Sequence, residues 1–230
     1  MKNFFAPSFF YKIPRIVIAW LGLLLVALMC AALYQALFVS PVDYQQGQMV
    51  RMMYVHVPSA WMALSIYVFI AILSFVCIVW KIPMCYIISA SAAPIGATFA
   101  AITLITGSIW GRPIWGTWWV WDARLTSMLV LFMIYVAYII VVRASDIILR
   151  AEKPASVIAI IGFVNVPIVK FSVEIWHSLH QPASILKMSG PSIHESMLLP
   201  LGLMFMSFIV YFLLALFMRV HFVLKIIKQK

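Results

Sequence analysis

The sequence predicts an all-α, polytopic membrane protein with six transmembrane helices, both termini in the cytoplasm and an outward-facing, tryptophan-rich loop between helices three and four. Hydrophobic residues make up 66% of the 230 residues and charged residues only 10%, and the mean hydropathy is +1.09. This composition leaves too little polar surface for a water-soluble globule. The apolar residues fall into six runs, each close to the ~20 residues that a helix needs to cross a bilayer.

The first three runs cover about 16–38, 54–80 and 85–109. The first run is longer than the core of a signal peptide, and no small-residue cleavage site follows it, so we interpret it as a retained helix. Pro94 lies within the third run. Neighbouring helices can satisfy the carbonyl group that a proline leaves free, so this residue is compatible with a transmembrane helix.

The last three runs cover about 125–148, 155–176 and 197–223. A charged cluster at 150–153 separates the fourth run from the fifth, and a basic tail follows the sixth. The sequence shows no strand-like alternation, low-complexity tract or internal repeat. We therefore expect the whole chain, 1–230, to form a single six-helix membrane domain.

The basic residues are distributed unevenly between the two sides of this arrangement. Eleven of the sixteen Lys and Arg residues lie on the side of both termini, namely Lys2, Lys12, Arg15, Lys81, Arg143, Arg150, Lys153, Arg219, Lys225, Lys228 and Lys230. The other side has five, namely Arg51, Arg112, Arg124, Lys170 and Lys187. Because basic residues are enriched in cytoplasmic loops, both termini should be cytoplasmic. The net charge of +10 then reflects this asymmetry and contact with anionic membrane lipid, and we expect no nucleic-acid binding.

Tryptophan is concentrated in the loop between the third and fourth runs. Five of the nine tryptophans lie there within twelve residues, namely Trp110, Trp115, Trp118, Trp119 and Trp121. An aromatic belt at the headgroup level explains any single one of them, but a belt is spread over all helix ends. Gly111, Pro113 and Gly116 indicate a shaped loop, at about 110–126, rather than a plain helix end. A flat aromatic wall of this kind favours a flat apolar ligand.

Three charged residues, Arg112, Asp122 and Arg124, flank the aromatic wall. In a structural interpretation, Asp122 caps the fourth helix and pairs with one of the two arginines. In a functional interpretation, Arg112 or Arg124 binds carboxylates of the ligand, because the forked guanidinium suits that group. The two interpretations are compatible.

Histidines lie at the outer ends of two different helices on the side of the tryptophan loop. His56 begins the second run, and His177 and His180 follow the fifth. A lone histidine at a membrane interface is usually structural, but two from different helices are placed as the axial ligands of a planar macrocycle must be. Zinc would need further ligands, and no cysteine is near. Since the chain also has no CxxCH motif, the sequence favours non-covalent haem b.

The tryptophan loop resembles the WWD signature of the haem-handling family of cytochrome c biogenesis, in the string Trp-Gly-Thr-Trp-Trp-Val-Trp-Asp-Ala-Arg-Leu-Thr-Ser at 115–127. The chain length, the six runs and the segments 39–47, 54–58 and 179–181 are similar to the haem exporter protein C (CcmC) group within that family. The resemblance covers nearly the whole chain. Larger relatives that ligate haem to apocytochromes have many more spans.

The resemblance implies a non-enzymatic role on the periplasmic side of a bacterial-type inner membrane. The protein would hold haem between His56 and His180 and load it onto a periplasmic haem chaperone. The family's second axial histidine matches His180 because Gln181 follows it, although His177 is a competing candidate. The other implied partners are a small single-span helper subunit and an ABC transporter with an ATPase subunit, since this chain has no ATP-binding motif.

Two other functions are compatible with a membrane protein of this composition. A b-type electron carrier would normally place its histidines inside helices near the membrane midplane, whereas the candidates here are at helix ends. A haem or small-molecule permease subunit would use Pro94, Gly96 and Gly107 in the third run to break a helix around a substrate path.

Overall fold

The computed structural model describes residues 15–145, 148–176, 178–180 and 193–229. Within these residues, six helical segments are long and apolar enough to cross a membrane, which confirms the predicted all-α fold with six spans. In chain order the elements are α2 (Arg15–Tyr34), the π-helical turn η1 (Gln35–Val39), the 3-10 turn η2 (Gln48–Met52), α3 (Met53–Trp80), α4 (Pro83–Trp115), α5 (Ala123–Arg143), the 3-10 turn η3 (Ile148–Ala151), α6 (Glu152–Gly162), α7 (Asn165–Ile175), the 3-10 turn η4 (Glu195–Met197) and α8 (Leu198–Gln229).

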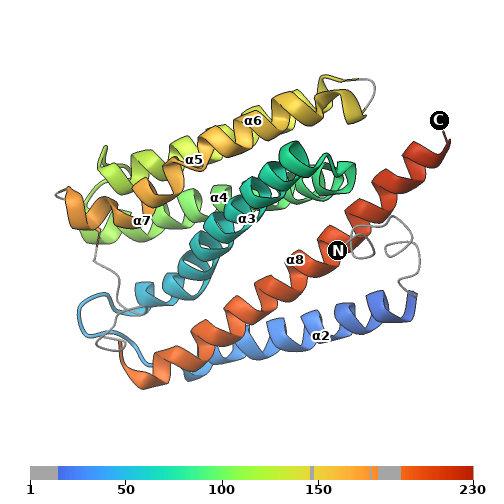
Figure 1. Ribbon diagram of the computed structural model, residues 1–230. Helices are drawn as coiled ribbons and strands as arrows, with labels where there is room; N and C mark the ends of the chain where they lie inside the picture. Colours follow the sequence, from blue (N-terminus) through green and yellow to red (C-terminus); the bar gives the residue numbers. More distant parts are fainter. Residues whose placement is uncertain (1–14, 146–147, 177, 181–192, 230) are drawn as a thin grey trace.

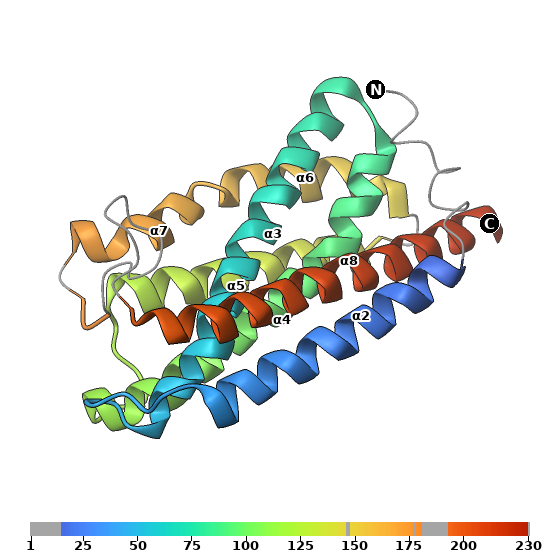
Figure 2. The same cartoon turned by 90° about the horizontal axis from the view of Figure 1, so that it is seen from below.

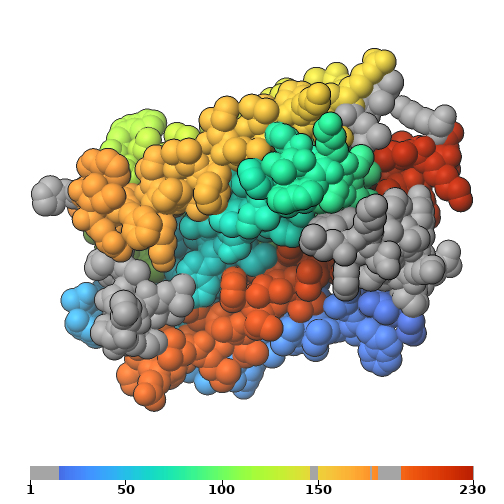
Figure 3. All heavy atoms as spheres, in the orientation of Figure 1, coloured from blue at the N-terminus to red at the C-terminus, as the bar shows by residue number. Residues whose placement is uncertain are grey.

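The helices form a bundle in which α3 and α4 lie in the middle (Figures 1 and 2). Helix α8 packs against both of them and carries α2 on its outer side, while α5, α6 and α7 cover the opposite side. Side chains of α3 and α8 meet without an opening on the face shown in Figure 3. Burial of the helices agrees with this arrangement. The most apolar stretch of the central helix α4 is 67% buried, and that of the outer helix α2 is only 6% buried.

Helix α4 is continuous through Pro94. Gly96, one of the residues that a permease would use to break this helix, instead allows close packing, because a Cβ atom there would clash with the ring of Tyr135. The buried Tyr135 hydroxyl donates a hydrogen bond of 2.7 Å to the carbonyl of Ala63 in α3. The glycine therefore lets a tyrosine of α5 reach across α4 to α3, and the predicted mark of a permease is not found.

The fifth predicted span is divided into two helices, α6 and α7, which the sequence did not predict. Pro167 has no N–H group to donate to the carbonyl of Phe163, so the regular hydrogen-bond pattern cannot pass this turn. The Asn165 side chain also donates a hydrogen bond of 2.9 Å to the carbonyl of Ser127 in α5. The break is thus held to the neighbouring helix.

Two predicted boundaries were wrong at the end of the bundle that holds the C-terminus of α8. Helix α5 ends at Arg143, before the predicted end at 148, since its 21 residues already cross ~30 Å of hydrocarbon. Helix α8 instead continues to Gln229, so Lys225 and Lys228 lie on the helix and do not form an irregular tail. Basic residues near a helix C-terminus complement its dipole, which favours this extension.

Candidate functional site

Three segments meet at the end of the bundle where α3 and α5 begin, at the left of Figure 1. They are the connection from α2 to α3, the connection from α4 to α5, and the segment after α7. The indole Nε1 of Trp110 donates a hydrogen bond of 2.9 Å to Gln46 in the first connection. Ser178, after α7, donates to the carboxylate of Asp122 in the second. The structure thus brings together the three outer segments that the sequence singled out.

His56 is the fourth residue of α3 and is held by a residue of α4. Its Nδ1 lies 3.1 Å from the hydroxyl oxygen of Thr106. The hydroxyl donates its one hydrogen to the carbonyl of Ile102 at 2.7 Å, which favours the tautomer of His56 in which Nδ1 carries the proton and the hydroxyl accepts it. The other ring nitrogen, Nε2, therefore carries the lone pair. The partner of one ring nitrogen decides which nitrogen is available to a metal, and here that nitrogen is Nε2.

The surroundings of His56 fix the plane of its ring. A Cβ atom at Gly107 would lie 3.0 Å from His56 Cε1, so a larger residue there would press on the imidazole and shift it. Trp110 contacts the imidazole edge to face, with 5.7 Å between the ring centroids. Gly107 was considered in the sequence as a possible break in the third helix. The structure shows that it makes room for a histidine.

His180 lies outside the helices and depends on polar contacts. Its Nδ1 is 3.7 Å from Oδ2 of Asp122, which is too long for a strong hydrogen bond but close enough for electrostatic attraction. Its backbone N–H donates to the Ser178 hydroxyl at 3.1 Å, and its ring packs at 5.0 Å from that of Trp115. The facing carboxylate favours a proton on Nδ1, which again leaves Nε2 with the lone pair.

Burial lowers the pKa of His180 to about 4, and the attraction of Asp122 opposes this shift only in part. The imidazole is therefore neutral at neutral pH, and a neutral imidazole is the form that binds metals. The rings of His56 and His180 are also close enough to interact electrostatically. His177 and Gln181 lie outside the described residues, so the competition between His177 and His180 stays a prediction.

Asp122 caps α5, as the structural interpretation predicted. It is the N-cap residue, and its Oδ1 accepts a hydrogen bond of 2.8 Å from the backbone of Leu125. Its Oδ2 faces Ser178 and His180. In the part of the chain that the structure describes, Asp122 makes no salt bridge with Arg112 or Arg124. The predicted pair is therefore not a direct salt bridge, because the second oxygen faces the segment after α7, although Asp122 still attracts Arg124 electrostatically.

The two arginines have different surroundings. Arg124 donates to the Ser172 hydroxyl at 3.4 Å and to the Lys170 carbonyl at 3.3 Å, so it joins α5 to α7. Arg112 is exposed, donates to the carbonyl of Gly116, and lies 5.8 Å from the centroid of the Trp118 ring. Arg112 is therefore the arginine whose guanidinium is more accessible to an anion.

The tryptophan segment is more helical than predicted. Helix α4 continues to Trp115 and ends at Gly116, whose φ of +75° is the left-handed conformation that favours glycine at a helix end. Trp110 and Trp115 therefore lie on α4, and the irregular loop covers 116–122. Gly111 does not shape a loop but lies against the Trp115 ring, which a Cβ atom would approach to 2.7 Å.

The remaining tryptophans lie on the irregular loop at 116–122 and differ in exposure. Trp118 and Trp121 are 58% and 76% exposed, whereas Trp119 is half-buried and packs edge to face on Trp121, with 5.4 Å between centroids. Trp110 and Trp115 are half-buried and contact the rings of His56 and His180, and the other three tryptophans follow on the adjoining loop. We call Trp110, Trp115, Trp118, Trp119 and Trp121 the tryptophan surface.

Three residues of this site were missed by the sequence reasoning: Gln46, Thr106 and Ser178. Thr106 and Trp110 are one helical turn apart on α4, which places them on one face. A polar residue one turn before a candidate tryptophan was a usable signal. Gln46 and Ser178 gave no such signal, because their partners are distant in the sequence.

The fold and the site define a polytopic helical membrane protein with paired histidines and a tryptophan surface at one end of the bundle. The family model described as Heme exporter protein C matches residues 1–230. The chain is 44% identical over 206 residues to Heme exporter protein C of Bradyrhizobium diazoefficiens, covering 90% of this chain and 78% of that protein.

Two further relatives extend this comparison. Heme exporter protein C of Escherichia coli K12 is 43% identical over 183 residues, which is 80% of this chain and 75% of the relative. A putative cytochrome c biosynthesis ccmC-like mitochondrial protein of Marchantia polymorpha is 48% identical over 186 residues, with 81% and 78% covered. The chain belongs to the heme exporter protein C family.

Proposed function

We propose that this protein binds haem b non-covalently on the periplasmic face of the inner membrane and delivers it to a periplasmic haem chaperone for the assembly of c-type cytochromes. The names of its relatives, which refer to heme export and to cytochrome c biosynthesis, support this proposal. The structural observation that carries it is the pair His56 and His180. Nδ1 of His56 faces the Thr106 hydroxyl at 3.1 Å, Nδ1 of His180 faces the Asp122 carboxylate at 3.7 Å, and tryptophan rings contact both imidazoles.

In this proposal, His56 and His180 are the axial ligands of the haem iron, and the tryptophan surface contacts the porphyrin ring. Apolar contact stabilises such a complex by roughly 25 cal/mol for each Å² buried. The accessible guanidinium of Arg112 suits a haem propionate, and Arg124 and Asp122 hold the surrounding segments in place. Cys77 and Cys85 lie at the opposite end of the bundle, near the end of α3 and the start of α4, and Cys30 lies within α2.

The uneven distribution of basic residues supports this sidedness. Their excess at the end of the bundle opposite the site favours a cytoplasmic location for that end and a periplasmic one for the histidines. A site at the surface of the membrane leaves one edge of the bound haem open to the chaperone. We propose no catalytic step for this chain, and the energy for release would come from an ABC transporter with an ATPase subunit, assembled with a small single-span helper.

The test is the absorption and electron paramagnetic resonance spectra of the purified protein after expression with haem available. We expect a low-spin bis-imidazole signal in the parent, which His56→Ala and His180→Ala each weaken and the double variant loses. His194→Ala is the matched control, because His194 is an exposed histidine that caps η4. A parent without haem, or an unchanged low-spin signal in the double variant, contradicts the proposal.

A further inference from the structure

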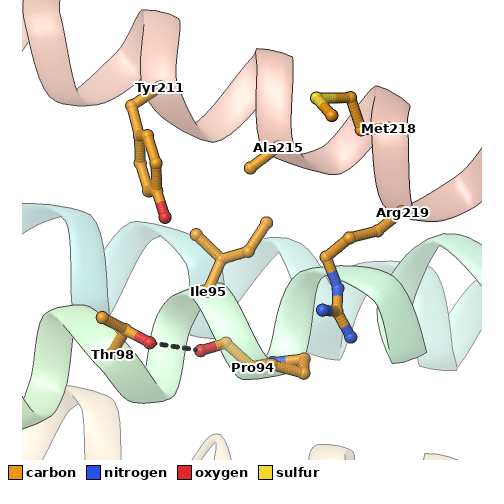
Figure 4. A pocket seen from close by; sticks show the side chains of 7 residues that line it. All are labelled: Pro94, Ile95, Thr98, Tyr211, Ala215, Met218 and Arg219. Carbon is orange, nitrogen blue, oxygen red and sulfur yellow. Dashed lines mark hydrogen bonds between the residues drawn. The ribbon is translucent and has the colours of Figure 1, made fainter.

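Figure 4 shows a groove between α4 and α8, whose lining residues differ from those that contact His56 and His180. It has a volume of about 310 Å³ and is lined by Pro94, Ile95, Thr98, Tyr211, Ala215, Met218 and Arg219. In Figure 4, the side chains of Tyr211 and Arg219 point from α8 toward α4, with Ile95 between them. The groove is therefore cationic at one end and mainly apolar along its length.

Helix lengths indicate that the cationic end is at the level of the lipid headgroups. Helix α8 begins at Leu198, and about 20 helical residues cross the hydrocarbon layer, so Arg219 follows the point where hydrocarbon ends. Helix α5 gives the same level independently, because it begins at Ala123 and ends at Arg143. Arg143 is near enough to Arg219 to interact with it electrostatically. Two arginines from different helices thus mark one interface.

The guanidinium of Arg219 is fixed in direction and still has donors available. Its Nε donates a hydrogen bond of 3.0 Å to the Ser91 carbonyl of α4. The other four N–H donors of a guanidinium belong to its terminal nitrogens. Among the described residues, no carboxylate forms a salt bridge with Arg219, and the side chain is exposed. An anion with several oxygen acceptors can therefore bind these nitrogens from the membrane side.

The charge of this end of the bundle favours an anionic membrane lipid. Its described basic residues are Lys81, Arg143, Arg150, Lys153, Arg219, Lys225 and Lys228. Among the described residues, Glu152 is the acidic residue at this end. Basic residues next to transmembrane helices attract anionic lipid, and the groove adds a defined apolar path to this attraction.

We propose that the groove between α4 and α8 binds one anionic phospholipid, with the phosphate on Arg219 and an acyl chain lying past Ala215 and Ile95 toward Tyr211. The bound lipid would fill the space between two helices that the Arg219 to Ser91 hydrogen bond already joins. This site is separate from the histidine site, so its test does not depend on haem.

Native mass spectrometry of the full-length protein in detergent can count bound lipids during titration with phosphatidylglycerol or phosphatidylcholine of the same acyl chains. We expect one retained phosphatidylglycerol and weaker retention of phosphatidylcholine. Arg219→Gln should weaken phosphatidylglycerol binding about tenfold, as expected for the loss of charged hydrogen bonds. Lys228→Gln, an exposed residue of the same helix, is the matched control and should change it little.

Ala215→Phe provides a second variant, which keeps the arginine and fills the groove. It should also weaken retention of phosphatidylglycerol. Because the two variants change the groove in different ways, a folding defect in Arg219→Gln does not decide the outcome. Equal effects of Arg219→Gln and Lys228→Gln would overturn the proposal in favour of diffuse surface charge. Equal retention of both lipids would overturn it as well. So would a bound lipid that haemin displaces and that Ala215→Phe still retains, because such a lipid would not lie in this groove.

Discussion

His56 and His180 reach the same end of the bundle with different kinds of support. His56 belongs to a continuous helix, its Nδ1 faces a neutral hydroxyl, and its ring occupies the space that Gly107 leaves. His180 lies outside the helices and faces the carboxylate of Asp122. Packing therefore positions the first histidine, and charge positions the second. Carboxylate partners raise the basicity of a ligating imidazole more than neutral ones do, so we expect two unequal axial ligands.

The largest effect should come from removing the space beside His56. Gly107→Leu places a side chain where even a Cβ atom would lie 3.0 Å from the ring, so the added atoms must displace the imidazole of His56 from its position. We expect loss of the low-spin haem signal, measured by absorption and magnetic resonance spectra. Gly22→Ala, at a glycine of α2 with open space around it, is the control. Full retention of the signal in Gly107→Leu would show that packing does not position His56.

Removing the charge that faces His180 should have the next largest effect. Asp122→Asn keeps an oxygen that can cap α5 but loses the negative charge. Changes to such partners typically cost about 10–100-fold in metal affinity, so we expect haem affinity to fall by at least about tenfold. Asp122→Ala should also lower the stability of the haem-free protein by about 1 kcal/mol, through the lost helix cap. Haem titration measures the effect on affinity, and thermal unfolding measures the effect on stability. Equal haem affinity of Asp122→Asn and the parent would show that the charge of Asp122 does not support His180.

The neutral support of His56 should matter less. Thr106→Val keeps the shape of the side chain but removes the acceptor for His56 Nδ1. A neutral hydrogen bond contributes about 1 kcal/mol, which corresponds to about fivefold in affinity. Thr106→Ser should restore the parent value, because it retains the hydroxyl. If haem titration gave a larger loss for Thr106→Val than for Asp122→Asn, the order of the two supports would be reversed.

The smallest effect should be the contribution of His180 to the pH dependence of stability. Its pKa is about 4 in the folded protein, against 6.5 for an ordinary histidine. The unfolded chain therefore binds a proton that the folded chain does not, and the stability of the haem-free protein should fall as the pH decreases from 6.5 toward 4. Thermal unfolding of His180→Gln in detergent should show a shallower decline over this window. A slope identical to that of the parent would indicate that the pKa of His180 is the same in the folded and the unfolded protein.

Hydropathy was sufficient to predict the six spans, because a run of apolar residues near the bilayer thickness has few alternatives to a transmembrane helix. The division of the fifth span was not predicted, since it depends on Pro167 together with a hydrogen bond from Asn165 to another helix. The extension of α4 to Trp115 was also missed. Gly111 and Pro113 were interpreted as loop residues, whereas both lie within the last turns of α4.

The candidate ligands could be predicted because their residue types are informative. The supports could not, since a threonine in an apolar run or a serine after a helix is common. Thr106 and His56 are 50 residues apart in the sequence, and Ser178 and Asp122 are 56 residues apart. Only the folded bundle brings them together. The roles of the site residues in binding haem stay predictions that the variants above test.

Asp122 connects two equilibria through a single side chain. One oxygen terminates the first turn of α5 and the other faces the segment that carries His180, so whatever orders that segment also restrains the start of a membrane-spanning helix. By thermodynamic linkage, a ligand held by His180 raises the free energy of fraying this helix end, and fraying lowers the affinity for the ligand by the same factor. Protection of the α5 amides from hydrogen exchange thus becomes a measure of occupancy at a site that those amides do not touch.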